Sequence, residues 1–202
     1  ASNEGICLRR ESQIRCRLMI LGIESSCDES ALAVFAPERG IVWESVYSQL
    51  ATHAVHGGVV PELAVREHLK KFPELIAAMP IKMSQIKRIA VTVGPGLAGS
   101  LAMGMALGKA LALEHELPLV GVNHLRAHAW SVFMPMHVDT LQKFDASIEE
   151  HLPQLGLLVS GGNTLMYEID EAREIKLIAR TQDDAAGEAL DKAAKMLGLP
   201  YP

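Results

Sequence analysis

Aromatic side chains, cysteines and long apolar runs are all scarce in this chain of 202 residues. Tryptophan, tyrosine and phenylalanine together make up 4% of the sequence, whereas apolar residues of all kinds make up 49%. The core must therefore be built mainly from alanine, valine, leucine and glycine, which suits closely packed α/β layers. No apolar run reaches the ~20 residues that a membrane-spanning helix needs, so we expect no membrane association.

The cysteines do not have the spacing of a zinc site; they are Cys7, Cys16 and Cys27. Their odd number favours a reducing compartment, and we expect a cytoplasmic location. Residues 1–18 are polar and lack the apolar segment of a secretory signal. Because Met19 opens the first predicted strand, we interpret residues 1–18 as a leader or an expression-derived segment outside the fold.

The formal net charge of −5 excludes an overall basic surface. A nucleic-acid contact would therefore have to use a local group of cations. The sequence offers two such groups, Lys70 with Lys71, and Lys82 with Lys87 and Arg88. Both groups also fit solvated charges on a helix or a loop, so the sequence leaves this choice open.

The chain up to residue 134 alternates strand-like and helical segments, and we interpret residues 19–134 as one subdomain. Apolar runs bounded by polar turns predict strands at residues 18–24, 31–36, 40–47, 87–93 and 119–122. Apolar positions at helical spacing predict helices at residues 61–79, with a kink at Pro73, and at about 98–114. This order is typical of a mixed sheet with crossover helices.

The remainder of the chain repeats the beginning of the first subdomain. A polar connecting loop or short helix is expected at residues 135–154, followed by strands at 155–160, 164–169 and 174–179 and a helix at about 185–197. Two copies of one α/β unit around a cleft indicate an actin-like ATPase fold, of the ASKHA and ribonuclease H-like class. The first subdomain is complete, and residues 155–202 contain only the beginning of the second.

Two histidines, His124 and His128, follow an apolar strand in Asn-His-Leu-Arg-Ala-His. A helix places residues i and i+4 on one face, so both imidazoles can reach one metal ion. Such a pair alone is more often found on an ordinary helix surface or cap. No glutamate follows His124, so the His-Glu-x-x-His pattern of zinc peptidases is absent, together with its general base.

Two polar turns occupy matching positions in the two halves. Residues 22–30 place a carboxylate and hydroxyls between two strands, where they can contact a metal-bound phosphate, although Asp28 and Ser30 also fit a simple hairpin cap. Residues 158–164, Leu-Val-Ser-Gly-Gly-Asn-Thr, let main-chain N–H groups approach an anion, although a plain hairpin has similar residues.

Two further segments have simpler structural explanations. Residues 94–100 lack the lysine of a phosphate-binding P-loop, and Gly104 and Gly108 in the next helix favour close helix packing. Residues 183–192 open the last predicted helix, where acidic side chains interact favourably with the helix dipole. Asp191 lies deeper in that helix and is a candidate to accept hydrogen bonds from a ligand.

Six segments together resemble the TsaD family of tRNA threonylcarbamoyladenosine synthases, formerly classed as glycoprotease-type O-sialoglycoprotein endopeptidases. They occur in the family's order, at residues 20–30, 57–68, 94–101, 122–128, 158–164 and 183–192. The resemblance implies transfer of a threonylcarbamoyl group from threonylcarbamoyl-AMP to the N6 amine of the adenosine beside the tRNA anticodon. It also implies two partner proteins, a paralogous actin-like subunit and a small ATPase of the same pathway.

The resemblance further implies the residues of the site, with no catalytic side chain assigned. His124 and His128 correspond to ligands of one divalent metal ion, iron or zinc. The residues that correspond to the family's adenylate-binding positions are Leu158, Val159, Ser160, Gly161, Gly162 and Asp191. The alternatives are a glycoprotease-type metallopeptidase and a non-catalytic actin-like scaffold, although the family's scaffold subunit lacks the histidine pair.

The chain departs from the family pattern in a few residues and in length. Ala127 stands where glycine is common, Arg126 where an acidic or small residue is common, and Val65 where serine is usual, and the connection at residues 134–153 is longer. The family pattern continues beyond Pro202 into a segment that supplies a third metal ligand, an aspartate. We therefore expect the 202-residue chain alone to be inactive and to hold metal weakly.

Overall fold

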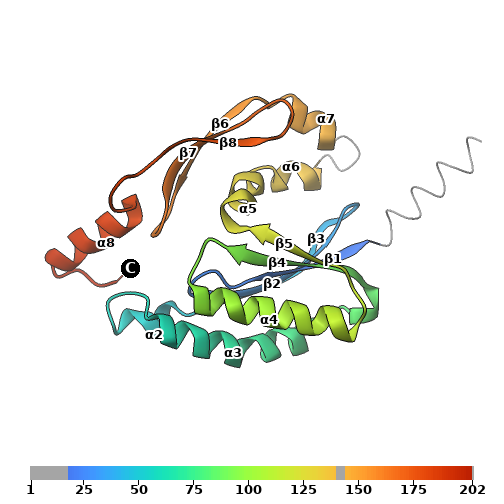
Figure 1. Ribbon diagram of the computed structural model, residues 1–202, viewed down its shortest axis with the longest axis horizontal. Coiled ribbons are helices and arrows are strands. Elements are labelled where there is room, and N and C mark those ends of the chain that lie inside the picture. Colours follow the sequence, from blue (N-terminus) through green and yellow to red (C-terminus); the bar gives the residue numbers. More distant parts are fainter. Residues whose placement is uncertain (1–17, 140–143, 202) are drawn as a thin grey trace, which may run out of the picture. The chain divides into compact units, whose positions relative to one another are not determined.

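Five strands form a mixed sheet in the first part of the chain, in the order β3-β2-β1-β4-β5 (Figure 1). The computed structural model describes residues 18–139 and 144–201. The strands are β1 (Met19–Glu24), β2 (Glu29–Ala36), β3 (Gly40–Ser48), β4 (Ile86–Gly94) and β5 (Leu119–Asn123). Strands β1, β2 and β3 pair antiparallel, whereas β1, β4 and β5 pair parallel. This arrangement is ribonuclease H-like and confirms the actin-like fold class.

Two helices, α3 (Pro61–Ala78) and α4 (Ala98–Glu114), pack against each other and against this sheet. Their shared core contains alternate strand residues and one face of α3, namely Leu21, Ile23, Leu32, Val34, Ile86, Ile89, Val91, Phe72 and Leu75. A methyl group at Gly104 would overlap Ser25, and one at Gly108 would lie 3.3 Å from Leu119. The two glycines therefore permit close packing of α4, as predicted.

The predicted strands and long helices of this part are all present. Helix α3 is continuous from Pro61 to Ala78, with Pro73 inside it. The sequence patterns did not predict the short helix α2 (Leu50–Ala54) or the 3-10 turn η1 (Met83–Gln85). Neither is long enough to display a helical period of apolar residues.

The later part of the chain forms a second, three-stranded antiparallel sheet in the order β6-β7-β8. Its elements are α5 (His124–Ser131), α6 (Met134–Asp139), α7 (Phe144–Glu149), β6 (Gln154–Val159), β7 (Thr164–Ile169), β8 (Ile175–Arg180) and α8 (Ala186–Met196). A separate core contains Ala129, Phe133, Ile148, Tyr167 and Ile169. The opposite face of β6 leaves Leu155, Leu157 and Val159 more than half exposed. Such an apolar outer face is unusual for an antiparallel sheet with one packed face.

The described residues divide into two compact units. The first runs to Gln49 and includes Pro61–His124, and the second contains Leu50–Val60 and the residues from Leu125 onward. The division lies inside α5, earlier than the expected end of the first subdomain at residue 134, because Ala129 and Phe133 pack with the second sheet. The expected connection at 135–154 contains α6 and α7, although residues 140–143 lie outside the described part. The subdomain bounds 19–134 and 155–202 remain predictions.

Candidate functional site

Strand β1 ends in Glu24, whose carboxylate is surrounded by hydrogen-bond donors. Its Oε2 accepts a very short hydrogen bond from the Thr92 hydroxyl of β4 and lies 3.3 Å from Nδ1 of His124. Its Oε1 accepts a hydrogen bond from the main-chain N–H of Ser26 at 2.5 Å. Because the neighbouring Ile23 is buried beneath the helices, strand alternation directs Glu24 to the other face of the sheet.

These donors keep Glu24 ionised. Burial raises the pKa of this carboxyl, but hydrogen bonds from His124, Ser26 and Thr92 lower it by a larger amount. The net effect lowers the pKa from its ordinary value of 4.5 to about 2. Glu24 is thus a carboxylate at neutral pH. It stabilises donors that point toward it and is poorly suited to hold a transferable proton.

The carboxylate also determines which nitrogen of His124 carries the proton. An ionised carboxylate only accepts hydrogen bonds, so Nδ1 of His124 is the donor, shared between Glu24 Oε2 and Ser26 Oγ at 3.3 Å each. In the neutral ring, Nε2 is then left with its lone pair. A carboxylate that holds the far nitrogen of an imidazole is a common feature of metal-bound histidines.

The two predicted metal ligands lie on the same helix. His124 is the first residue of α5, and the exposed His128 follows one helical turn later. The tautomer of His124 fits metal binding. Over residues 18–139 and 144–201, however, no three histidine, cysteine, aspartate or glutamate side chains are grouped closely enough to hold a metal ion. For the proposed site, the described residues thus supply two nitrogen ligands, one fewer than a stable site normally has.

The turn between β1 and β2, residues 25–28, is anchored to α4 and to the loop before it. The Ser25 hydroxyl donates to the Ser100 carbonyl at 2.8 Å, and the Leu97 N–H donates to the Ser26 carbonyl at 2.8 Å. A side chain at Gly96 would overlap Ser26. These contacts bring the segment at residues 94–100 to the turn, and Gly96 permits this close approach.

In the second unit, the beginning of α8 rests on the turn that follows β6. Leu158 and Val159 end β6, and Ser160 closes the turn with Asn163, by a main-chain hydrogen bond of 2.8 Å. The N–H of Gly187 donates to the Ser160 carbonyl at 3.1 Å. The structure thus brings the predicted segment at residues 158–162 against the predicted helix.

The glycines around this turn differ in what the fold requires of them. A methyl group at Gly187 would lie 2.7 Å from the Ser160 carbonyl oxygen and 2.8 Å from Gly161, so helix and turn need glycine there. At Gly161 and Gly162 a methyl group would meet nothing within 4 Å. Neither residue is among the glycines with positive φ. The packing of the described residues therefore does not require glycine at these two positions.

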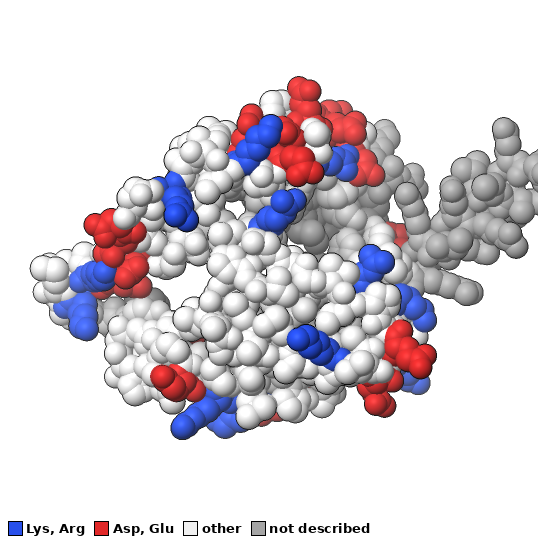
Figure 2. All heavy atoms as spheres, viewed as in Figure 1, with Lys and Arg blue, Asp and Glu red and all other residues white. Residues whose placement is uncertain are grey.

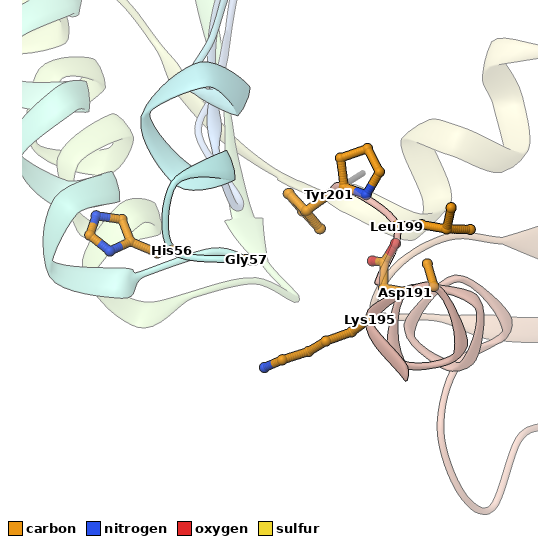
Figure 3. A pocket seen from close by; sticks show the side chains of 8 residues that line it. His56, Gly57, Asp191, Lys195, Leu199 and Tyr201 are labelled. Carbon is orange, nitrogen blue, oxygen red and sulfur yellow. The ribbon is translucent and has the colours of Figure 1, made fainter. Parts of the chain in front are cut away.

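Asp191 lies on α8 and lines a pocket of the second unit (Figure 3). The other lining residues are His56, Gly57, Ala194, Lys195, Leu199, Pro200 and Tyr201. Residues 158–162 do not line it. The predicted adenylate-binding residues therefore belong to two places, the turn before α8 and this pocket along α8.

Charged side chains on the viewed face do not gather into one broad basic patch (Figure 2). Lys70 and Lys71 are paired with Glu67 and Glu74, each at 2.8 Å. On α8, Lys192 pairs with Asp184 at 2.7 Å. Exposed pairs of this kind add little stability, and they neutralise one of the two cation groups that the sequence offered for RNA.

In the segment at residues 22–30, the sequence pattern pointed to Asp28 and Ser30 rather than to Glu24. Thr92 and Ser26 were also not singled out. One signal was present: Glu24 is a charged residue at the end of an apolar strand whose alternate positions are buried. A charge at such a position usually has partners.

Comparison with known proteins identifies the family to which this chain belongs. A family model described as TsaD, tRNA N6-adenosine threonylcarbamoyltransferase, matches residues 40–202. Proteins of that name from Geobacter sulfurreducens and Legionella pneumophila (strain Paris) are 43% and 41% identical to this chain over 189 residues. The matches cover 92% of this chain but only 52% and 54% of the relatives, so the chain spans about half their length.

Solved structures are more distant. YeaZ from Pseudomonas aeruginosa is 13% identical, with a TM-score of 0.48, and the match covers 81% of this chain and 67% of that one. This value is too low to add to the assignment, which follows from the family model and the curated relatives. The family model matches most of the sequence, and the chain therefore belongs to the TsaD family of tRNA N6-adenosine threonylcarbamoyltransferases.

Proposed function

We propose that this chain provides part of the active centre that transfers a threonylcarbamoyl group to tRNA. The acceptor is the N6 amine of the adenosine next to the anticodon, and the donor is threonylcarbamoyl-AMP. The observation that carries the proposal is the orientation of His124 by an ionised Glu24, within a chain that matches this family. Membership of the family alone would not show whether the geometry around His124 and Glu24 suits this transfer reaction.

The reaction needs positioning more than a covalent intermediate. The N6 nitrogen attacks the carbamoyl carbonyl carbon, the bond from that carbon to the phosphate oxygen breaks, AMP leaves with the bonding electrons, and the amine proton passes to solvent. A phosphate is already a good leaving group. Alignment of donor and acceptor therefore accounts for much of the expected acceleration.

The turn at residues 160–163 is suited to the adenylate part of the donor. Gly161 and Gly162 are exposed and are not required by the chain's own packing, which leaves room for a ligand to approach their main chain. The beginning of α8 lies against this turn and contributes partial positive charge. Asp191 can accept hydrogen bonds from ribose hydroxyls.

The metal part of the proposal concerns His124 and His128, with iron or zinc as the ion. A bound divalent ion would act as a Lewis acid toward the donor. Glu24 accepts from Nδ1 of His124, so Nε2 is the unprotonated nitrogen of the neutral ring, and a further ligand has to come from outside the described residues. We therefore expect weak metal binding by this chain alone.

The remaining partners are also proposals. We propose tRNA, a paralogous actin-like subunit and a small ATPase as partners, and a cytoplasmic location. Over the described residues, no helix is sufficiently long and apolar to cross a membrane. The peptidase and scaffold alternatives gain no support, because the matching family and the cited relatives are transferases by name.

The test of transfer uses two proteins. One is the 202-residue chain alone, and the other is the chain joined to the part of the Geobacter sulfurreducens relative that it does not cover. Each is incubated with threonylcarbamoyl-AMP, the partner proteins and a tRNA transcript, and the modified nucleoside is measured by mass spectrometry. We expect product only from the chimera, reduced about 100-fold or more by His124→Ala. A folded chimera that forms no product, beside an active relative, would contradict the proposal.

The adenylate turn is tested separately by AMP binding to the 202-residue chain, measured by calorimetry. Gly161→Val and Gly162→Val should leave the melting temperature unchanged, because open space surrounds both positions. They should weaken AMP binding about tenfold or more, since the side chains occupy the place of the ligand. Unchanged AMP affinity in both variants would remove this turn from the site.

A further inference from the structure

A network of buried polar side chains lies between α3 and the first two strands. Ser30, Gln49 and His68 are all fully buried, with exposed fractions of 0%. Burial of three polar side chains is costly unless they are hydrogen-bonded. An apolar core at this place would avoid that cost, so the network needs another explanation.

His68 is the centre of this network. Its Nε2 lies 2.9 Å from the carbonyl oxygen of Cys27, and its Nδ1 lies 2.7 Å from the hydroxyl of Ser30. A carbonyl oxygen can only accept, so Nε2 carries the proton, and in the neutral ring Nδ1 accepts from Ser30. The ring of Phe72 stacks on His68 at 5.7 Å and holds the imidazole in place from within α3.

The main-chain contacts of the β1–β2 turn explain what this arrangement does. His68 holds the Cys27 carbonyl from α3, and Leu97 holds the Ser26 carbonyl from the loop before α4. The N–H of Gln49 donates to the Asp28 carbonyl at 3.0 Å. Three consecutive carbonyl groups of the turn are thus fixed from three different segments of the first unit.

The same turn carries the groups that orient His124. Ser26 contacts Glu24 through its N–H and His124 through its hydroxyl. The Cys27 carbonyl held by His68 is one residue further along. A shift of this carbonyl therefore moves Ser26, and with it the acceptors that select the tautomer of His124.

We propose that His68 is a positioning residue, which holds the β1–β2 turn in the geometry where Glu24 and Ser26 orient the ring of His124. Its importance for catalysis rests on the proposed function, but its effect on the turn and on His124 does not. The hydrogen bonds of His68 go to Cys27 and Ser30, whereas Ser26 is the residue of the turn that contacts His124. The inference therefore predicts changes at a distance that can be measured without any turnover.

The experiment uses the 202-residue chain with EDTA, so that no metal contributes, and with Cys7 and Cys16 replaced by serine so that Cys27 is the sole thiol. His68→Leu removes both hydrogen bonds at similar volume, and His68→Gln keeps a donor and an acceptor. Leu75→Ala is the matched control, because Leu75 is buried on the same helix and belongs to the apolar core. His68→Met, which also removes the hydrogen bonds to Cys27 and Ser30, is a second loss variant, should His68→Leu fail to fold.

Two measurements report on the tautomer of His124 and on the opening of the turn. Nitrogen NMR of the ring of His124 should show the Nδ1–H tautomer in the parent chain and in the Gln and Leu75→Ala variants. In His68→Leu it should move toward the Nε2–H form that free histidine prefers. Alkylation of Cys27 should become about tenfold faster in His68→Leu, because the hydrogen bond to the Cys27 carbonyl no longer opposes opening of the turn.

Any of three other outcomes would overturn the inference. A His68→Leu chain with the parent tautomer and the parent alkylation rate would show that the turn does not depend on His68. Equal changes in Leu75→Ala would assign the effect to general loss of stability. If the His124 tautomer and the Cys27 alkylation rate changed as much in His68→Gln as in His68→Leu, the effect would be due to packing of the ring against Phe72. Failure of the transferase assay would change none of these readings.

Discussion

Replacement of Glu24 by glutamine is expected to lower stability in a pH-dependent way. Glutamine has a single carbonyl oxygen, which can accept from Ser26 or from Thr92 but not from both, and it removes the negative charge beside His124. The pKa of Glu24 is lowered in the folded chain, so its contribution is present above the unfolded value of 4.5. That contribution is lost as the pH falls from 4.5 toward about 2.

The size of the effect follows from the pKa and from the exposure of the side chain. A decrease from 4.5 to about 2 sets an upper limit of about 3 kcal/mol, at about 1.4 kcal/mol per pKa unit. The Glu24 side chain is 33% exposed, so solvent screens part of this interaction. We therefore expect Glu24→Gln to reduce the free energy of unfolding by about 1–2 kcal/mol at neutral pH.

The assay is urea unfolding followed by circular dichroism, in EDTA, at about pH 7 and at several values down to about pH 3. The difference between the parent chain and Glu24→Gln should be greatest near neutrality and should shrink below pH 4.5. Glu44→Gln, at an exposed position on β3, is the matched control and should change little. A constant difference at every pH, or none at pH 7, would refute the assigned role of the charge.

Three further predictions concern packing and metal binding. Gly187→Ala should lower the free energy of unfolding by about 1–3 kcal/mol, since its methyl group would lie 2.7 Å from the Ser160 carbonyl, whereas Gly161→Ala should change it by less than about 0.5 kcal/mol. Thermal melts of the two variants compare these effects directly, and equal melting temperatures would contradict the packing argument. Ile89→Ala should cost about 2–5 kcal/mol in urea titrations, because Ile89 is fully buried in the first core. Calorimetry should detect only weak zinc binding by the 202-residue chain, and His124→Ala should abolish it; tight binding would show that a third ligand is present after all.

The order and type of the main elements follow from local patterns. Strand β2 alternates buried and partly exposed residues, and the five predicted strands of the first sheet are all present. The long helices α3 and α4 display enough turns to be predicted. The short helix α2 was not predicted, because its five residues are held by their surroundings rather than by a repeating pattern.

Candidate site residues could be proposed from the sequence to the extent that their chemistry is visible in a short segment. The spacing of His124 and His128 and the paired glycines at 161 and 162 are local features, and the sequence revealed both. The role of Glu24 was not revealed, because its contacts lie 68 and 100 residues away in Thr92 and His124.

His68 gives the same lesson in a stronger form. At helical spacing it lies between Ala64 and Phe72 on the buried face of α3, but the sequence does not show which groups its ring contacts. Only the fold brings its two nitrogens to the Cys27 carbonyl and the Ser30 hydroxyl.

The sequence by itself thus determined the α/β class, the order of the elements, the family and the histidine pair. These properties depend on residue periodicity and on short segments, which the chain carries in any conformation. The tertiary structure decided which nitrogen of His124 carries the proton, which glycines the packing requires and which buried side chains hold the turn. These properties depend on distances between residues far apart in the sequence, and only the packed sheet and helices establish those distances.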